Sequence, residues 1–200
     1  MAPILPRLTK KEIDDILGAR DLSRWEKDLG VYVYLREHLH RAADPAITGD
    51  YQRKFNYFYQ VRRNAEWRDK FYALFYERVR VGTADFGDVL RALHVATNRV
   101  EASFASKFVA TINPNSPVID RHVLSYLHQK LPPQTRPPEE RIAMIIEIYE
   151  GMREGFAVYL ASPEGSYLAE RLSNERAGKE LIPMKMLDFV LWQSGGKKKK

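Results

Sequence analysis

The chain has 200 residues, an apolar fraction of 44% and a formal net charge of +6, which suit one globular domain with a buried core. It contains no cysteine, so disulfides, thiolate catalysis, cysteine-ligated zinc and iron–sulfur clusters are excluded. The start has no long apolar signal stretch and no segment is apolar enough to span a bilayer, so we expect a cytoplasmic protein without membrane contact.

Helix start and stop signals follow one another along the chain and predict about nine helices and no strand. Thr9 and Glu12 form a capping-box pattern for a helix ending near Gly18. A longer helix is expected over residues 22–43, with Gly30 as a candidate break, followed by helices over 51–63, over 65–79 after the cap Asn64, and to about residue 96 after the cap Thr83. The later helices are expected over residues 102–112, from 121, over 139–160, 163–178 and 183–192.

These signals predict a single compact all-α domain over residues 1–194. Residues 195–200 are expected to form a flexible basic tail, typical of an expression scar or of a disordered basic arm. Four of the positive charges lie in this tail, and without them the net charge is +2, so charge alone is a weak argument for nucleic acid.

The sharpest candidate for chemistry lies in residues 101–127. A helix over residues 102–112 is followed by Asn113 and Pro114, which stop it. Asp120 then occupies the N-cap position of the next helix, ahead of the apolar residues Val123 and Leu124. A carboxylate at that position has a fixed direction, either as a plain helix cap or as a catalytic group.

We interpret the remaining groups of histidine, aromatic and basic residues as parts of the fold and not as functional sites. The five histidines lack the spacing of a zinc helix, and no phosphate-binding or nucleophile-elbow motif occurs, so no metal site and no cofactor are expected. Aromatic residues alternate with basic ones, which suits either base stacking or a helical core, and their helical spacing favours the core. The aromatic band comprises Phe55, Tyr57, Phe58, Tyr59, Trp67, Phe71, Tyr72, Phe75 and Tyr76.

Residues 117–123, Pro-Val-Ile-Asp-Arg-His-Val, resemble the catalytic-aspartate segment of the helix-hairpin-helix DNA glycosylases, the superfamily of endonuclease III and 8-oxoguanine glycosylase. The final run, residues 185–192, is similar to the last helix of that family. The resemblance implies cleavage of the N-glycosidic bond of a damaged base in duplex DNA, flipped out of the stack. It implies Asp120 and Lys107 as catalytic residues, the latter for a Schiff-base lyase step. The residues implied to contact nucleic acid are Arg99, Ser103, Ser106, Arg121 and His122.

Two departures keep a second hypothesis open. The family hairpin is rich in glycine, whereas residues 96–103 contain none. The family lysine aligns near Ser103, so Lys107 lies one helical turn later and is either catalytic from there or a solvated lysine. The alternative is therefore a non-catalytic helical module on the same scaffold that binds nucleic acid or a protein partner. The sequence does not indicate the oligomeric state.

Overall fold

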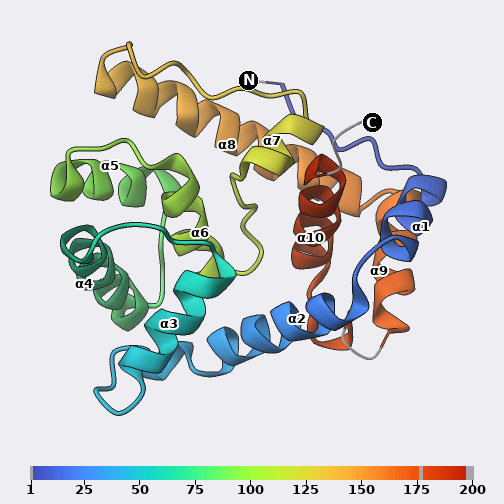
Figure 1. Cartoon of the computed structure of the whole chain (residues 1–200). Coiled ribbons are helices and arrows are strands. Elements are labelled where there is room, and N and C mark those ends of the chain that lie inside the picture. The colour runs from blue at the N-terminus through green and yellow to red at the C-terminus, as the bar shows by residue number, and fades with distance from the viewer. Residues whose placement is uncertain (1, 176–177, 197–200) are drawn as a thin grey trace. The chain divides into compact units, whose positions relative to one another are not determined.

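The computed structural model describes residues 2–175 and 178–196, and every regular element in these two ranges is helical (Figure 1). Ten α-helices and two short 3₁₀ helices follow one another along this part of the chain. The predicted all-α class is confirmed, with ten α-helices in place of about nine. No helix within the described ranges is long and apolar enough to cross a membrane.

Contacts divide the chain into two compact units, each with its own core. The central unit is residues 22–113, and the terminal unit combines residues 1–21 with residues 114–200. The single domain expected over residues 1–194 stays a prediction, because two contact units can belong to one folding domain. Of the expected tail, residues 195 and 196 belong to the last helix, and residues 197–200 lie outside the described residues.

The central unit contains five α-helices and one 3₁₀ helix: α2 (Leu22–Glu37), η1 (Leu39–Arg41), α3 (Thr48–Phe58), α4 (Ala65–Val81), α5 (Phe86–Thr97) and α6 (Ala102–Ile112). Helix α4 packs on α5 and α6, α5 packs on α6, and α2 packs on α3. Much of the aromatic band forms the core: Phe55 lies 5.6 Å from Phe71 and 5.5 Å from Phe75 between ring centroids, and Phe75 lies 5.1 Å from Phe108. These rings are fully buried, as their helical spacing predicted.

The terminal unit contains α1 (Lys10–Gly18), α7 (Arg121–Tyr126), α8 (Pro138–Leu160), α9 (Pro163–Ser173), η2 (Gly178–Glu180) and α10 (Pro183–Gly196). Helix α10 contacts α1, α7, α8 and α9, so it is the central helix of this unit. Its residues Leu187, Val190 and Leu191 are completely buried, so the apolar run of this helix forms part of the core of the unit.

The segment before α1 is fixed on α8. The amide of Ile4 donates a hydrogen bond of 2.8 Å to the carbonyl of Gly151, and the hydroxyl of Tyr159 donates one of 3.2 Å to the carbonyl of Leu8. A Cβ atom at Gly155 would lie 2.0 Å from the carbonyl oxygen of Ile4, so only glycine permits this close approach.

Capping signals located most helix starts correctly. The capping box of Thr9 and Glu12 and the caps Asn64 and Asp120 are all present. Some expectations were wrong. The cap of α5 is Asp85 and not Thr83, and helix α2 runs through Gly30 without a break but ends at Glu37, before residue 43. Helix α3 ends at Phe58, well before residue 63, and α9 ends at Ser173, before residue 178.

Candidate functional site

Asp120 lies at the N-cap of α7 in the terminal unit. Its backbone is extended, with φ −133° and ψ 152°, and its Oδ1 accepts a hydrogen bond of 2.8 Å from the amide of His122. The residue is half-buried. The predicted cap is therefore confirmed, and the carboxylate combines a fixed orientation with access to solvent.

The link that leads into Asp120 is held by a buried carboxylate of α10. Oδ1 of Asp188 accepts a hydrogen bond of 3.3 Å from the amide of Val118, and its Oδ2 lies 2.9 Å from the ammonium of Lys185. Asp188 and Lys185 are 6% and 2% exposed. Burial raises the pKa of Asp188 above its ordinary value, and the charge of Lys185 acts in the opposite direction.

Two further polar side chains of this unit are buried. Ser116 lies in the link itself, and Tyr149 lies on α8. Burial raises the pKa of Tyr149 far above the usual tyrosine value, so the Tyr149 hydroxyl is uncharged at neutral pH. The carboxylate of Asp188 on α10 thus fixes the backbone two residues before Asp120, through the amide of Val118.

Arg121 and His122 follow Asp120 at the start of α7. The Nε of Arg121 donates a hydrogen bond of 3.1 Å to Nε2 of His122. The ring of His122 meets that of Trp192 edge-on, with 5.8 Å between centroids. Arg121 is exposed, which leaves it accessible for the phosphate contact expected of it.

Lys107 lies on α6 in the central unit and is not a solvated lysine. It is 9% exposed, its ammonium donates a hydrogen bond of 3.1 Å to the carbonyl of Tyr59, and it lies 5.5 Å from the centroid of the Phe104 ring. Tyr59 is the C-cap of α3, so the lysine charge faces the negative end of that helix. This geometry gives Lys107 a structural role of its own.

The turn between α5 and α6 contains an asparagine in a backbone conformation that is most common for glycine. Asn98 has φ 54° and ψ 31°, a left-handed conformation that asparagine tolerates better than most residues. At the start of α6, Glu101 is 8% exposed and lies 2.9 Å from Arg63 and 3.1 Å from Arg99. A tight helical hairpin therefore forms without glycine, with a carboxylate near the start of its second helix.

The structure separates the sequence-predicted residues into two groups. Asp120, Arg121 and His122 belong to the terminal unit, whereas Lys107 belongs to the central unit together with Arg99, Ser103 and Ser106. Convergence of Lys107 and Asp120 on one cleft stays a prediction, because the two lie in different units. Ser106 is completely buried and donates to the carbonyl of Ser103, which counts against a direct contact with nucleic acid.

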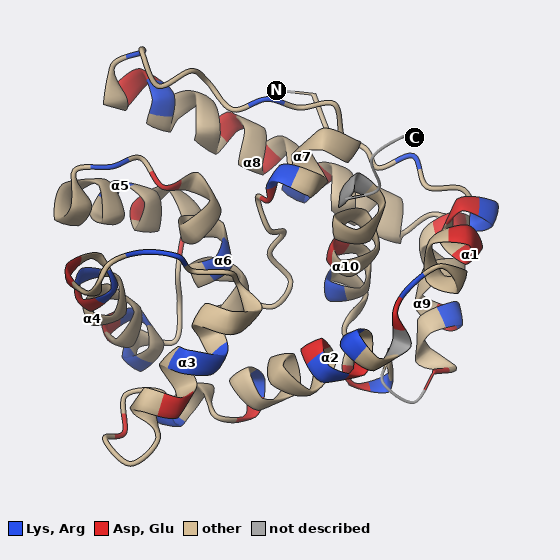
Figure 2. Cartoon of the chain, in the orientation of Figure 1, with Lys and Arg blue, Asp and Glu red and all other residues tan. Residues whose placement is uncertain are grey.

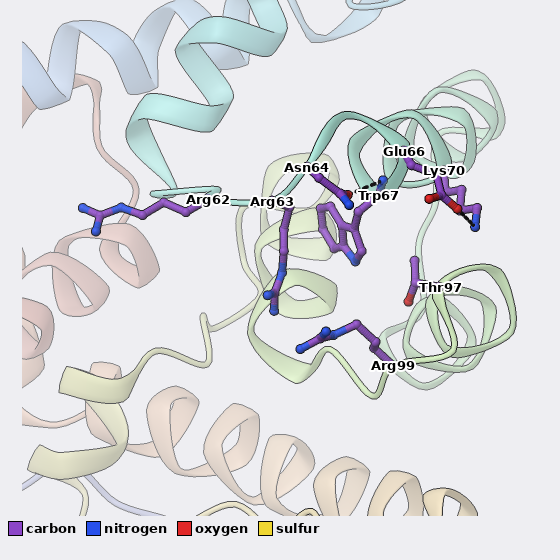
Figure 3. Close-up of a pocket in the computed structure, with 8 residues that line it drawn as sticks. All are labelled: Arg62, Arg63, Asn64, Glu66, Trp67, Lys70, Thr97 and Arg99. Carbon is purple, nitrogen blue, oxygen red and sulfur yellow. Dashed lines mark hydrogen bonds and ion pairs between the residues drawn. The ribbon is translucent and has the colours of Figure 1, made fainter.

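Sequence reasoning missed a pocket in the central unit. The pocket has a volume of about 300 Å³ and lies between the start of α4 and the α5–α6 turn (Figure 3). Figure 2 shows basic segments at both of these places. We name it the arginine pocket; it is lined by Arg62, Arg63, Asn64, Glu66, Trp67, Lys70, Thr97 and Arg99. The paired arginines before the cap Asn64 were the available signal, but their partner Arg99 is 36 residues away in the chain.

Among the described residues, no cluster of histidine, aspartate and glutamate has the arrangement of a metal site. No family model, curated protein or solved structure matches this chain. The assignment of a function therefore rests on the geometry of Asp120, of its supporting residues and of the arginine pocket.

Proposed function

We propose that the chain is a DNA-binding protein of the helix-hairpin-helix glycosylase type in which Asp120 promotes release of a base. The observation that carries the proposal is the support of the Asp120 link by the buried pair Lys185–Asp188, which holds the amide of Val118. An ordinary helix cap needs only its own side chain. A carboxylate on a backbone fixed by buried charges has the rigidity that catalysis requires.

The chemistry follows from the charge of Asp120. Cleavage of an N-glycosidic bond develops positive oxocarbenium character on the sugar. A carboxylate near the sugar stabilises that charge, or takes a proton from the water that attacks it. The target base must leave the stack before either contact can form.

We propose that the base is released by hydrolysis without a Schiff base. A lysine nucleophile must present an unprotonated amine to the sugar carbon. The amine of Lys107 is directed at the carbonyl of Tyr59 and packs against Phe104, and the residue is buried. This arrangement favours a role in fixing α6 to the end of α3.

A non-catalytic nucleic-acid-binding module on the same scaffold is the second candidate. It is favoured by the burial of the aromatic band, which leaves few rings for a flipped base. The two candidates agree on DNA binding and differ only in base release.

The deciding experiment compares Asp120→Asn with Asp85→Asn. Both residues are aspartate N-caps, since Asp85 accepts from the amide of Asp88 at 3.0 Å, and asparagine preserves a cap while removing its charge. Both variants and the wild type are incubated with duplexes containing uracil, 8-oxoguanine or an alkylated base. We expect Asp120→Asn to lose base release by about a hundredfold or more and Asp85→Asn to retain it. Absence of release by the wild type would leave the binding module as the function, whereas equal release by Asp120→Asn would eliminate Asp120 as the catalytic group and leave it as a helix cap.

A further inference from the structure

The arginine pocket carries an excess of positive charge. Its lining contains the cations Arg62, Arg63, Lys70 and Arg99 and one carboxylate, Glu66. Glu66 lies 2.7 Å from Lys70, and Glu101 behind the pocket lies within 3.1 Å of two of the arginines. Counting both carboxylates, the site retains two positive charges, so an anion is the ligand that its electrostatics favour.

Trp67 offers this pocket a hydrogen-bond donor and no ring face. The residue is 6% exposed; its indole stacks on Phe71 at 5.2 Å with 17° between the planes and lies 4.8 Å from Phe104. The Nε1–H is buried and has no acceptor in the part of the chain that the structure describes. Because the faces are covered, Trp67 cannot stack on a base, and its N–H edge is what remains for a ligand.

Arg63 supplies a second buried donor. Its guanidinium is held 2.9 Å from Glu101 and lies 5.8 Å and 5.2 Å from the centroids of Trp67 and Phe104. Its Nε is buried without a partner within the described ranges. Figure 3 shows the Trp67 indole directed toward Thr97 and Arg99, and the ends of Arg63 and Arg99 turned toward each other. A ligand must therefore carry several acceptor oxygens and negative charge.

We propose that the arginine pocket binds a phosphate group, with Trp67 Nε1–H as a neutral donor and Arg63, Lys70 and Arg99 as charged donors. Phosphate oxygens accept from several directions at once and match guanidinium groups in particular. A volume of about 300 Å³ accommodates such a group with part of its attached molecule. The proposal goes beyond base release and does not depend on Asp120; the phosphate comes either from a nucleic-acid backbone diester or from a terminal phosphomonoester.

The first experiment titrates the protein with inorganic phosphate by calorimetry, at constant ionic strength set with chloride. Trp67→Phe keeps an aromatic ring at this position and removes the N–H, and we expect it to weaken binding about tenfold. Lys70→Gln on the exposed side of the pocket should also weaken binding, whereas Glu66→Gln removes the one acid of the lining and should strengthen it. Arg80→Gln, an exposed arginine farther along α4, is the charge-matched control and should leave binding unchanged.

Phosphate should also raise the melting temperature of the wild type more than that of Trp67→Phe or Lys70→Gln, because a ligand stabilises only the state that binds it. Lys70→Gln keeps the test decisive if Trp67→Phe folds poorly, since Lys70 is exposed. Equal affinities for all four variants, or no phosphate binding by the wild type, would overturn the proposal.

The second experiment identifies the source of the phosphate. Duplexes with and without a 5′-phosphate are bound to the wild type and to Lys70→Gln. A preference for the 5′-phosphate that Lys70→Gln abolishes indicates a terminal phosphomonoester, and equal weakening on both duplexes indicates a backbone diester. Asp120→Asn should bind inorganic phosphate like the wild type, so loss of base release and loss of phosphate binding are separate results. If Lys70→Gln binds both duplexes as tightly as the wild type does, the pocket receives no phosphate from DNA.

Discussion

The ammonium of Lys185 and the carboxylate of Asp188 lie 2.9 Å apart in the interior of the terminal unit, three residues apart on α10. Asp188 uses its other oxygen to hold the amide of Val118, two residues before Asp120. Two buried charges therefore connect the central helix of this unit to the backbone that positions the candidate catalytic carboxylate. The arrangement has consequences for stability that can be measured.

Lys185→Met should destabilise the protein by about 3 kcal/mol or more at neutral pH, because the charge of Asp188 is then buried without its cation. Replacing both residues with apolar ones, Lys185→Met with Asp188→Leu, should restore much of the lost free energy of unfolding. Urea denaturation of the two single variants and the double variant gives the coupling energy. Lys11→Met, which breaks an exposed pair, is the control and should change stability little.

The loss in Lys185→Met should depend on pH. Burial already raises the pKa of Asp188, and removal of Lys185 removes a cause that lowers it, so the pKa rises further. Because the pKa of Asp188 is raised in the folded state, the stability that this group contributes is fully present below its ordinary pKa of 3.8. That contribution is lost as the pH rises through the pKa of the folded state. The difference in unfolding free energy between the wild type and Lys185→Met should thus be smaller near pH 4 than at pH 7. A difference independent of pH would show that Asp188 is not the group responsible.

Gly155→Ala should destabilise the terminal unit by about 1–3 kcal/mol, because the new Cβ would overlap the carbonyl oxygen of Ile4, 2.0 Å away. Limited proteolysis should then cut within residues 2–8 sooner than in the wild type. Gly30→Ala is the opposite control: Gly30 lies inside α2 with no atom within 4 Å of an added Cβ, so alanine should stabilise by about 1 kcal/mol. Similar effects of the two substitutions would contradict the close approach of the first segment to α8.

Buried tyrosines should make the fold sensitive to alkali. Burial raises the pKa of Tyr126 to about 12 and raises the pKa values of Tyr51, Tyr72, Tyr149 and Tyr159 still further above the ordinary value of 10.0. The native state keeps protons that the unfolded chain releases, so stability is present below pH 10 and falls as pH rises above it. Ultraviolet titration of phenolate should show these five tyrosines ionising late and together with unfolding. Ionisation of all eleven tyrosines near pH 10 with the helices intact would contradict their burial.

Local signals predicted most of the helices because capping depends on residues two or three apart. Asn64 and Asp120 are clear cases. The signal fails where two capping residues compete: Thr83 and Asp85 both qualify, and the choice of Asp85 follows from burial of Phe86 and Leu90 against neighbouring helices. Gly30 does not break α2, since burial of flanking residues such as Leu29 and Tyr32 outweighs the helix penalty of glycine.

The sequence predicted the position of Asp120 but not the arginine pocket. Asp120 lies in a local pattern, whereas the arginine pocket joins residues 62–70 with residues 97 and 99 through the packing of α4 on α5 and α6. Periodicity in the sequence does not specify which helices meet. The pair Lys185–Asp188 did carry a signal, two charges at helical spacing inside an apolar run, but the same pattern occurs on solvated helix faces.

The last prediction concerns Lys107. Incubated with borohydride and a duplex containing an abasic site, the wild type should form no covalent adduct, because the amine donates to Tyr59 and the residue is buried. Lys107→Gln should instead lower the free energy of unfolding by about 1–3 kcal/mol, since the carbonyl of Tyr59 loses a charged donor in the interior. Lys130→Gln, an exposed control, should change neither readout. An adduct that forms with the wild type and Lys130→Gln but not with Lys107→Gln would make Lys107 the nucleophile and replace hydrolysis with a Schiff-base mechanism.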